Sequence, residues 1–241
     1  MIETGMILAA GRGTRMQPKP DDPPKPLIEI AGQSLLARMM DRLIAARVSR
    51  IIVNVHHKAE MIETALQAYQ DRVELHISDE REALLETGGG VKNALPLIGD
   101  KPFFVCNADI LWQENSAALA GLAQGFDAAR MDGRLLLAAR ATGTGYDGAG
   151  DFDLLDDGRL RRRDRAEAPY IFAGVQILTP AIFADMNDTA FSLNLAYDAG
   201  LARGRLHGAV LDGVWMHVGT PEGRQIAEHI LTGDTPPAPR P

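Results

Sequence analysis

The sequence predicts an α/β fold with a mixed, mainly parallel central sheet flanked by helices. In the first half of the chain, short β-rich runs alternate with amphipathic stretches, which is typical of parallel strands joined by crossover helices. Later β-rich runs follow one another through Gly- and Asp-rich turns, which indicates a mixed sheet. The length of 241 residues, 46% of them apolar, is enough to bury a substantial core as one large domain.

The first half divides into four strands and three helices. We expect the first helix from Ser34 to Arg47, because apolar residues recur there at helical spacing and Ser34 is available as an N-cap. A second helix fits residues 58–68, and a third begins in the glycines at 88–90. The strands are predicted at residues 5–10, 51–55, 73–78 and 103–107.

After Asp109 the pattern changes, and we expect strands at 134–140, 150–155 and 168–178, then two short ones within 205–217. Further helices are predicted at 116–125, 179–187, 192–203 and 220–231. No linker separates two domains, so residues 1–231 are interpreted as one domain. The tail 232–241, which contains four prolines, is predicted to be flexible.

Composition excludes several classes of protein. The formal net charge of −7 argues against nucleic-acid binding, because a reader of the phosphate backbone needs a concentrated basic face. The chain shows no leader segment, and no apolar run approaches the roughly 20 residues of a membrane span, so we predict a cytoplasmic protein. The single cysteine, Cys106, lies in an apolar run and is interpreted as a buried hydrophobe.

The first strand runs directly into the glycine loop Leu8-Ala9-Ala10-Gly11-Arg12-Gly13-Thr14-Arg15-Met16. Small residues leave the backbone open where a strand ends, so its N–H groups can face an anion such as a triphosphate. A tight strand-to-helix turn would explain the glycines but not the nearby arginines and lysine. The spacing matches neither a Walker loop nor a dinucleotide fingerprint.

Lys25 is the second cationic feature. It lies in Pro24-Lys25-Pro26-Leu27, where the prolines restrict the backbone and reduce the entropy lost in placing the ammonium group. Arg15 and Lys25 can neutralise phosphate oxygens, which is the main contribution of a protein to phosphoryl-type transfer. For Arg12, a phosphate contact and a solvated position both remain open.

The two segments L-A-A-G-R-G-T-R-M and P-K-P-L together resemble the signature of the sugar-1-phosphate nucleotidyltransferases. The resemblance covers about residues 3–231 and implies a Rossmann-like nucleotidyltransferase core. It implies that Lys25 helps to bind the phosphates and that the triphosphate is held by the loop residues Leu8, Ala9, Ala10, Gly11, Arg12 and Gly13. Three further segments, at 85–90, 150–152 and 172–175, resemble the uridylyltransferases that act on N-acetylmuramate α-1-phosphate in peptidoglycan recycling.

Glycines 88–90 open the predicted third helix, so bare backbone there could approach the edge of a base. A plain helix entry is the alternative. In the family the matching segment reads the nucleobase. The resemblance therefore implies Thr87, Gly88 and Gly89 as base contacts, with Glu86 as a further candidate.

Asp109 follows an apolar strand, where its carboxylate can ligate Mg²⁺ or cap the next helix. The family uses this aspartate as its metal ligand, and Asn107 resembles a position that meets the acceptor sugar. The chain departs from the family at His217, where many relatives have an aspartate as second metal ligand. His217 could ligate a softer ion such as Mn²⁺, Asp212 could replace it, or the metal could rest on Asp109, phosphates and water. We favour the last two over direct ligation of Mg²⁺ by His217, which could instead bond only phosphate or backbone.

The sugar side is predicted at Gly150 and Asp151, where a carboxylate could accept hydrogen bonds from sugar hydroxyls or an amide, although turn chemistry also explains the pair. Gly174 lies in a β-rich run and can signal close approach of a ligand. The arginine-rich stretch 159–165 either forms a solvated hairpin or contacts the sugar phosphate.

These residues imply a direct displacement in which the acceptor phosphate attacks the α-phosphorus of UTP and pyrophosphate leaves. No protein nucleophile is needed. The partners are therefore a nucleoside triphosphate, a sugar 1-phosphate and Mg²⁺ or Mn²⁺. Two rivals remain: a related enzyme such as a mannose-1-phosphate guanylyltransferase, and a non-catalytic regulatory subunit that binds nucleotide sugars.

Overall fold

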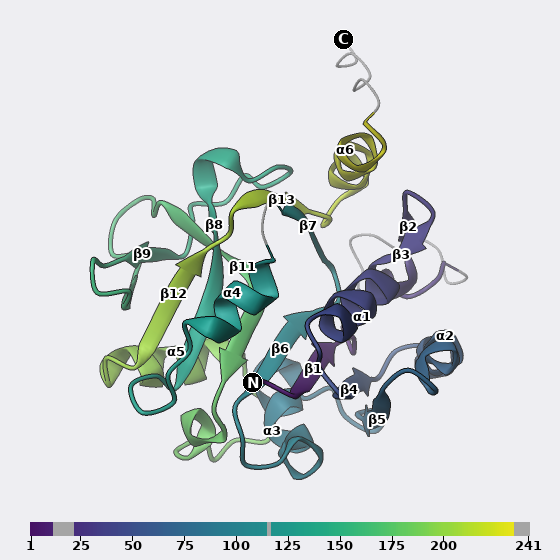
Figure 1. Ribbon diagram of the computed structural model, residues 1–241, viewed down its shortest axis with the longest axis horizontal. Helices are drawn as coiled ribbons and strands as arrows, with labels where there is room; N and C mark the ends of the chain where they lie inside the picture. The colour runs from purple at the N-terminus through teal and green to yellow at the C-terminus, as the bar shows by residue number, and fades with distance from the viewer. Residues whose placement is uncertain (12–21, 115–116, 234–241) are drawn as a thin grey trace.

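The computed structural model describes residues 1–11, 22–114 and 117–233, which fold around a central mixed sheet (Figure 1). Nine strands of the described chain form it. Their spatial order is β10 (Leu160–Arg162), β9 (Phe152–Leu154), β11 (Tyr170–Leu178), β6 (Phe103–Asn107), β1 (Thr4–Leu8), β4 (Arg50–Val55) and β5 (Glu74–Asp79), with β8 (Gly133–Ala139) beside β11 and β12 (Leu206–Val210) beside β8. The predicted mixed sheet flanked by helices is confirmed.

The strands β6, β1, β4 and β5 are parallel, and their carboxyl ends therefore meet at one edge of the sheet. The register places Leu8 opposite Asn54 on β4 and opposite Asn107 on β6. In open α/β sheets, ligands bind in the crevice at this edge. The edge is called the carboxyl edge below.

Strand β11 runs antiparallel to β6 and β8, so its beginning lies at the carboxyl edge. The register on β8 shifts between Phe172 and Gln176, which marks a β-bulge. Gly174 lies inside this bulge with a φ of +83°, a conformation that side chains with a Cβ rarely adopt. Strands β9 and β10 pair antiparallel beyond β11.

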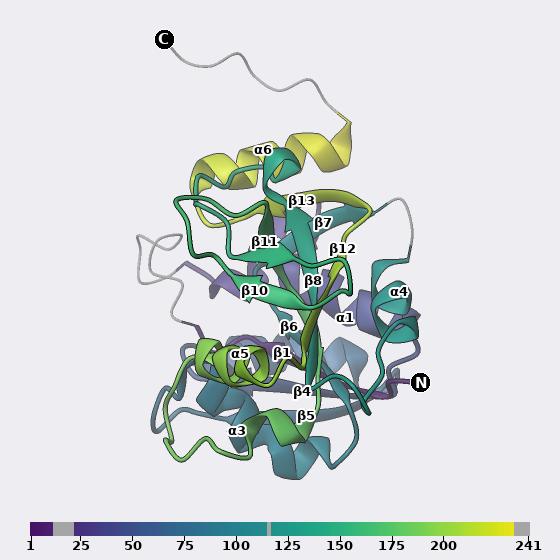
Figure 2. The ribbon, with the colours of Figure 1, turned by 90° about the vertical axis from the view of Figure 1, so that its left-hand side faces the viewer.

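Helices cover both faces of the sheet, as Figure 2 shows for α3 and α5 on one side and α1 and α4 on the other. The face of α1 (Leu35–Ala45) also carries α2 (Ala59–Leu66) and α4 (Ala118–Gln124). The opposite face carries α3 (Glu86–Ile98) and α5 (Leu193–Ala202). Single 3₁₀ turns are η1 (Lys25–Leu27), η2 (Gln67–Tyr69), η3 (Arg140–Thr142) and η4 (Pro180–Phe183).

A second, smaller ribbon lies beside the main sheet. It pairs β7 (Ile110–Glu114) with β13 (Gly213–His217), and α6 (Pro221–Thr232) packs on it together with the short strands β2 (Glu29–Ile30) and β3 (Gln33–Ser34). The guanidinium of Arg42 on α1 lies 3.9 Å from the centre of the Trp112 ring and donates to Glu114 at 2.7 Å. These contacts fix the middle of the ribbon and its Glu114 end against α1.

The predicted elements of the first half are confirmed, including the Ser34 cap, whose Oγ accepts from the Ala37 N–H at 3.1 Å. The predicted helix at 179–187 is wrong, because it is only the 3₁₀ turn η4. The chain after η4 is bonded to α3, where Lys92 Nζ donates to the carbonyl of Met186 at 2.5 Å. The strands β7 and β10 were not predicted. Most of the predicted tail, residues 234–241, lies outside the described residues.

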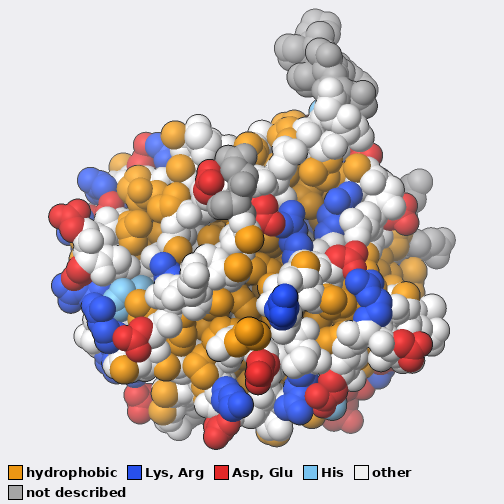
Figure 3. All heavy atoms as spheres, viewed as in Figure 1, with side chains coloured by type: hydrophobic (Ala, Val, Ile, Leu, Met, Phe, Trp, Pro, Cys, Tyr) orange, Lys and Arg blue, Asp and Glu red, His pale blue; other side chains and the backbone are white. Residues whose placement is uncertain are grey.

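Figure 3 shows basic and acidic side chains interspersed among apolar ones on the face that it displays. Cys106 is fully buried in β6, as predicted, and burial raises the pKa of its thiol. None of the helices in the described ranges combines the length and apolarity that crossing a bilayer would require.

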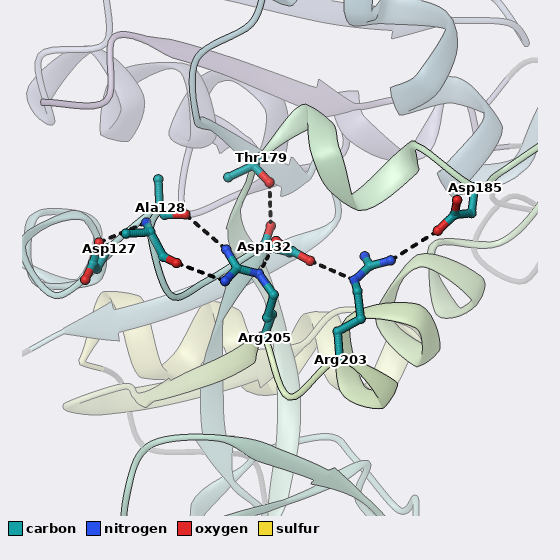
Figure 4. A network of polar contacts seen from close by, with 8 residues as sticks. Asp127, Ala128, Asp132, Thr179, Asp185, Arg203 and Arg205 are labelled. Carbon is teal, nitrogen blue, oxygen red and sulfur yellow. Dashed lines mark hydrogen bonds and ion pairs between the residues drawn. The ribbon is translucent and has the colours of Figure 1, made fainter.

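A buried carboxylate joins three segments at the sheet edge opposite the carboxyl edge (Figure 4). Asp132 is 6% exposed and accepts from Arg203 Nε at 3.0 Å and from Arg205 Nε at 2.6 Å. Its backbone oxygen accepts from the Thr179 N–H at 2.9 Å. Arg203 also reaches Asp185, whose side chain is 79% exposed.

We predict that Asp132→Ala lowers the free energy of unfolding by about 2–4 kcal/mol, because it leaves two arginines beside a buried site without their shared acceptor. Asp185→Ala is the matched control, and its loss should stay below about 0.5 kcal/mol because that ion pair is exposed. Urea unfolding followed by circular dichroism measures both variants. Equal losses in the two variants would contradict the account of this network.

Candidate active site

A pocket of about 230 Å³ opens at the carboxyl edge, beside the ends of β1, β4, β5 and β6. It brings together the predicted nucleotide residues Leu8, Ala10, Gly11 and Thr87 with the predicted acceptor and metal residues Asn107 and Asp109. Residues that the prediction did not include also line it, namely Asn54, Glu80 and Leu84, together with the further candidate Glu86.

Lys25 and Asp109 form an ion pair across 84 residues of sequence, with Lys25 Nζ 2.7 Å from Asp109 Oδ2. The backbone of Lys25 is held in η1, where the Ile28 N–H donates to the Lys25 carbonyl at 3.1 Å. The lysine side chain is 11% exposed and the aspartate side chain 41% exposed. The pair therefore combines a sheltered cation with a carboxylate that solvent and ligands can reach.

Asn54 and Glu80 are the polar residues that sequence reasoning missed. Asn54 is 2% exposed and Glu80 is 3% exposed, and Asn54 Nδ2 donates to Glu80 Oε1 at 2.7 Å. Burial raises the pKa of Glu80, an effect that its hydrogen bonds to Asn54 and Leu85 partly offset. A signal was present in the sequence, since Asn54 interrupts the apolar run of β4 at the carboxyl edge.

Glycines 88–90 lie inside the first turns of α3, and each allows a close packing contact. A Cβ on Gly88 would lie 2.4 Å from the Phe191 ring, one on Gly89 would lie 2.2 Å from the Thr189 carbonyl oxygen, and one on Gly90 would lie 2.6 Å from Glu80 Oε1. The N–H groups of Gly88 and Gly89 both donate to the Phe191 carbonyl, at 2.8 and 3.0 Å. Chain packing therefore accounts for this glycine run.

The residues just before the glycines face the pocket instead. Glu86 has a φ of +61°, unusual for a residue with a Cβ, and lines the pocket together with Thr87. Thr87 Oγ1 accepts from the Leu193 N–H at 3.0 Å, which joins this loop to the first turn of α5.

On the predicted sugar side, Asp151 Oδ2 accepts from the Phe172 N–H at 2.8 Å. Gly150 has a φ of +77°, and its N–H donates to the Tyr146 hydroxyl at 3.3 Å. Turn chemistry thus accounts for Gly150, while the placement of Asp151 beside β11 leaves its acceptor role as a prediction. A Cβ on Gly174 would lie 2.7 Å from Ile110 Cγ2, so this glycine lets the bulge pack against the residue next to Asp109.

His217 lies opposite Ile110 in the ribbon, so it occupies the same end of the ribbon as Asp109. Asp212 precedes the pair Gly213–Glu114 at the other end, four pairs away along the ladder. The ribbon therefore disfavours Asp212 as a partner of Asp109. The His217 ring centroid is 6.2 Å from that of Tyr146, whose hydroxyl reaches Gly150. Tyr146 thus contacts both His217, a candidate metal ligand, and Gly150 on the predicted sugar side.

The arginine-rich stretch is mostly committed to internal ion pairs. Arg161 and Arg165 both bond the buried carboxylate of Asp153, and Arg162 bonds Asp198 on α5. This pattern fits the hairpin alternative. The predicted phosphate contacts Arg12, Gly13 and Arg15 lie outside the described residues.

The fold places a candidate ligand pocket at the carboxyl edge of an α/β sheet, and the comparisons identify the class as a nucleotidyltransferase. The family model of the MobA-like NTP transferase domain matches residues 5–133. An N-acetylmuramate α-1-phosphate uridylyltransferase of Caulobacter vibrioides is 44% identical, covering 94% of this chain and 96% of the relative. One of Neisseria meningitidis serogroup B is 34% identical over 89% and 92% of the two chains.

More distant relatives and solved structures agree with this class. A mannose-1-phosphate guanyltransferase of Hypocrea jecorina is 28% identical, covering 90% of this chain and 61% of that protein. The crystal structure of HddC from Yersinia pseudotuberculosis complexed with GMP-PN has a TM-score of 0.74 and 25% identity, covering 95% of this chain and all of that one. The chain belongs to the MobA-like NTP transferase family, among the sugar-1-phosphate nucleotidyltransferases.

Proposed function

We propose that this protein transfers the uridylyl group of UTP to N-acetylmuramic acid α-1-phosphate, which gives UDP-N-acetylmuramic acid and pyrophosphate. The observation that carries the proposal is the Lys25–Asp109 pair, at 2.7 Å, beside a pocket whose walls include Gly11 and Thr87. The two uridylyltransferases reported above support the choice of base and sugar. We place the reaction in the cytoplasm and in one domain, residues 1–231, with 1–110 mainly for nucleotide and 111–231 mainly for sugar phosphate.

Within this proposal, the backbone from Leu8 to Gly11, continuing into Arg12, Gly13 and Arg15, holds the triphosphate. Lys25 neutralises charge that builds up as pyrophosphate leaves. Thr87 forms the base side, and Gly88 and Gly89 support it by close packing, since their N–H groups already donate to Phe191. Asn107, Asp151 and the Gly150 and Gly174 turns shape the acceptor side. The acceptor phosphate is already anionic, so no residue has to remove a proton from it.

The donor set fits a divalent cation. Asp109 offers a carboxylate oxygen at the pocket, and His217 stands at the same end of the ribbon. No group of three acidic, histidine or cysteine side chains gathers within the described ranges, so phosphates and water would complete the coordination. When bound, the cation would supply countercharge to the phosphate oxygens. We propose Mg²⁺, with Mn²⁺ as an alternative that imidazole suits better.

We predict that His217→Asp preserves or raises kcat with Mg²⁺ and lowers the ratio of Mn²⁺-supported to Mg²⁺-supported activity by about threefold or more, because Mg²⁺ prefers oxygen ligands. Pyrophosphate release in each metal measures this ratio, with the unmodified protein as control. A severe loss of activity in both metals would show instead that the imidazole itself is required.

Pyrophosphate release from UTP and N-acetylmuramic acid α-1-phosphate tests the proposed reaction. We expect turnover that requires both substrates and stops when a chelator removes the divalent cation. Nucleotide binding without turnover for any sugar 1-phosphate would instead favour a non-catalytic regulatory subunit. The histidine at position 217, where many relatives have an aspartate, motivates that alternative.

A further inference from the structure

Two loops meet at the carboxyl edge, one after β1 and one between β5 and α3, and a buried chain of hydrogen bonds through Asn54 on β4 connects them. The Ala9 N–H, just after β1, donates to Asn54 Oδ1 at 2.7 Å. Asn54 Nδ2 donates to Glu80 Oε1 at 2.7 Å. The Leu85 N–H, at the start of α3, lies 3.4 Å from Glu80 Oε2. The chain thus runs from the glycine loop to the first turn of α3, where Glu86 and Thr87 lie.

The order of donors and acceptors along these hydrogen bonds fixes whether each group donates or accepts. Because Asn54 Oδ1 is occupied by a backbone donor, its Nδ2 must donate, and Glu80 must accept. Both side chains are at most 3% exposed, so water cannot readily replace a lost partner. Removing the Glu80 side chain therefore leaves the Asn54 amide without its acceptor. Removing the Asn54 side chain leaves Glu80 Oε1 without its donor and the Ala9 N–H without its acceptor.

Neighbouring groups hold the pair in place. The carbonyl oxygen of Glu80 lies 2.7 Å from His56 Nδ1, which fixes the end of β5 against the loop after β4. Gly90 is packed so tightly on the pair that a Cβ there would lie 2.6 Å from Glu80 Oε1 and 3.0 Å from Asn54 Nδ2. Helix α3 therefore rests on the pair, and the spacing between the two loops depends on it.

We propose that Asn54 and Glu80 are positioning residues, an inference that rests on the proposed function. They set the distance between the triphosphate loop, which follows β1 at Ala9, and the base loop, which ends at Leu85, Glu86 and Thr87. A nucleoside triphosphate spans both loops, so it gains affinity only when they are correctly spaced. A ligand that reaches one loop alone does not depend on that spacing. The pair acts through the backbone of Ala9 and Leu85.

The test compares three ligands: UTP, which spans both loops, uridine, which reaches only the base side, and tripolyphosphate, which reaches only the phosphate side. Dissociation constants are measured for Glu80→Ala, Asn54→Ala and the double variant. We expect each single variant to weaken UTP binding about tenfold and to change the other two ligands by less than about twofold. The double variant should be no weaker than the singles, because both residues act in one chain.

Two further variants separate positioning from general loss of structure. Glu80→Gln keeps one oxygen that can accept from Asn54 but loses the acceptor of the Leu85 N–H, so we expect a UTP affinity between those of Glu80→Ala and the unmodified protein. Ser78→Ala is the matched control: Ser78 is 3% exposed on β5, two residues before Glu80, and its Oγ accepts from Asn93 on α3 at 3.3 Å, but it does not line the pocket. It should leave UTP binding unchanged.

Several results would overturn the inference. If Glu80→Ala weakens uridine as much as UTP, Glu80 contacts the base directly. Additive losses in the double variant, or an equal loss in Ser78→Ala, would exclude a dedicated positioning chain. Unmodified protein that binds UTP while all variants bind it equally well overturns this inference alone, whereas unmodified protein without affinity for UTP overturns the proposed function and the inference with it.

Discussion

Asp109→Asn is expected to lower kcat by about a thousandfold, because it removes the carboxylate that we propose as ligand of the cation while keeping the size of the side chain. The variant should fold normally, since the Asp109 side chain is 41% exposed. The variant should lose affinity for the cation and should also show a lower kcat when the cation is saturating, because a neutral amide oxygen is a weaker metal ligand than a carboxylate. Steady-state pyrophosphate release over a range of Mg²⁺ concentrations measures both quantities.

Asp100→Asn serves as the control for this variant, because Asp100 is an exposed aspartate that does not line the pocket. Its kcat should match that of the unmodified protein. Near-normal turnover of Asp109→Asn at saturating Mg²⁺ would reject the proposed role of Asp109.

Lys25→Met should lower kcat/KM for UTP by about a hundredfold, or roughly 2.7 kcal/mol of transition-state stabilisation. The reason is that a sheltered cation, 11% exposed, interacts more strongly with phosphate oxygens than a solvated one. Lys25→Arg keeps the charge but changes the shape of the cationic group. We therefore expect its kcat/KM for UTP to lie between those of Lys25→Met and the unmodified protein.

An alternative role for Lys25 is only to orient Asp109. In that case Lys25→Met would free the carboxylate, raise the affinity for Mg²⁺ and leave kcat/KM for UTP at saturating Mg²⁺ unchanged. Measuring kcat/KM for UTP at several Mg²⁺ concentrations distinguishes the two roles, and an unchanged kcat/KM at saturating Mg²⁺ would contradict direct phosphate contact.

The fold was largely predictable because its signals are local. Apolar runs, helical spacing and the Ser34 cap each act within a few residues, and the structure confirms them. The helix expected at 179–187 is only a 3₁₀ turn, and the chain after it has a distant partner, since Lys92, 94 residues before Met186, donates to the carbonyl of Met186. Strand β10 was hidden in an arginine-rich stretch because its charges are paired with distant carboxylates.

The sequence also predicted part of the candidate site, but not the residues whose partners are far away along the chain. Lys25 and Asp109 were expected to share a site, and the structure brings them to 2.7 Å. Asn54 and Glu80 were missed because their importance comes from partners 45 and 26 residues away. The glycines at 88–90 were detected, but the packing of Gly88 and Gly89 was not, because their partners Phe191 and Thr189 lie about a hundred residues later.

The most direct test of the central claim is kcat/KM for each of UTP, GTP, CTP, dTTP and ATP with the 1-phosphates of N-acetylmuramic acid, N-acetylglucosamine, glucose and mannose. We predict that UTP with N-acetylmuramic acid α-1-phosphate exceeds every other pair by about tenfold or more, which corresponds to about 1.4 kcal/mol of discrimination. A clear preference for GTP with mannose 1-phosphate would contradict the account.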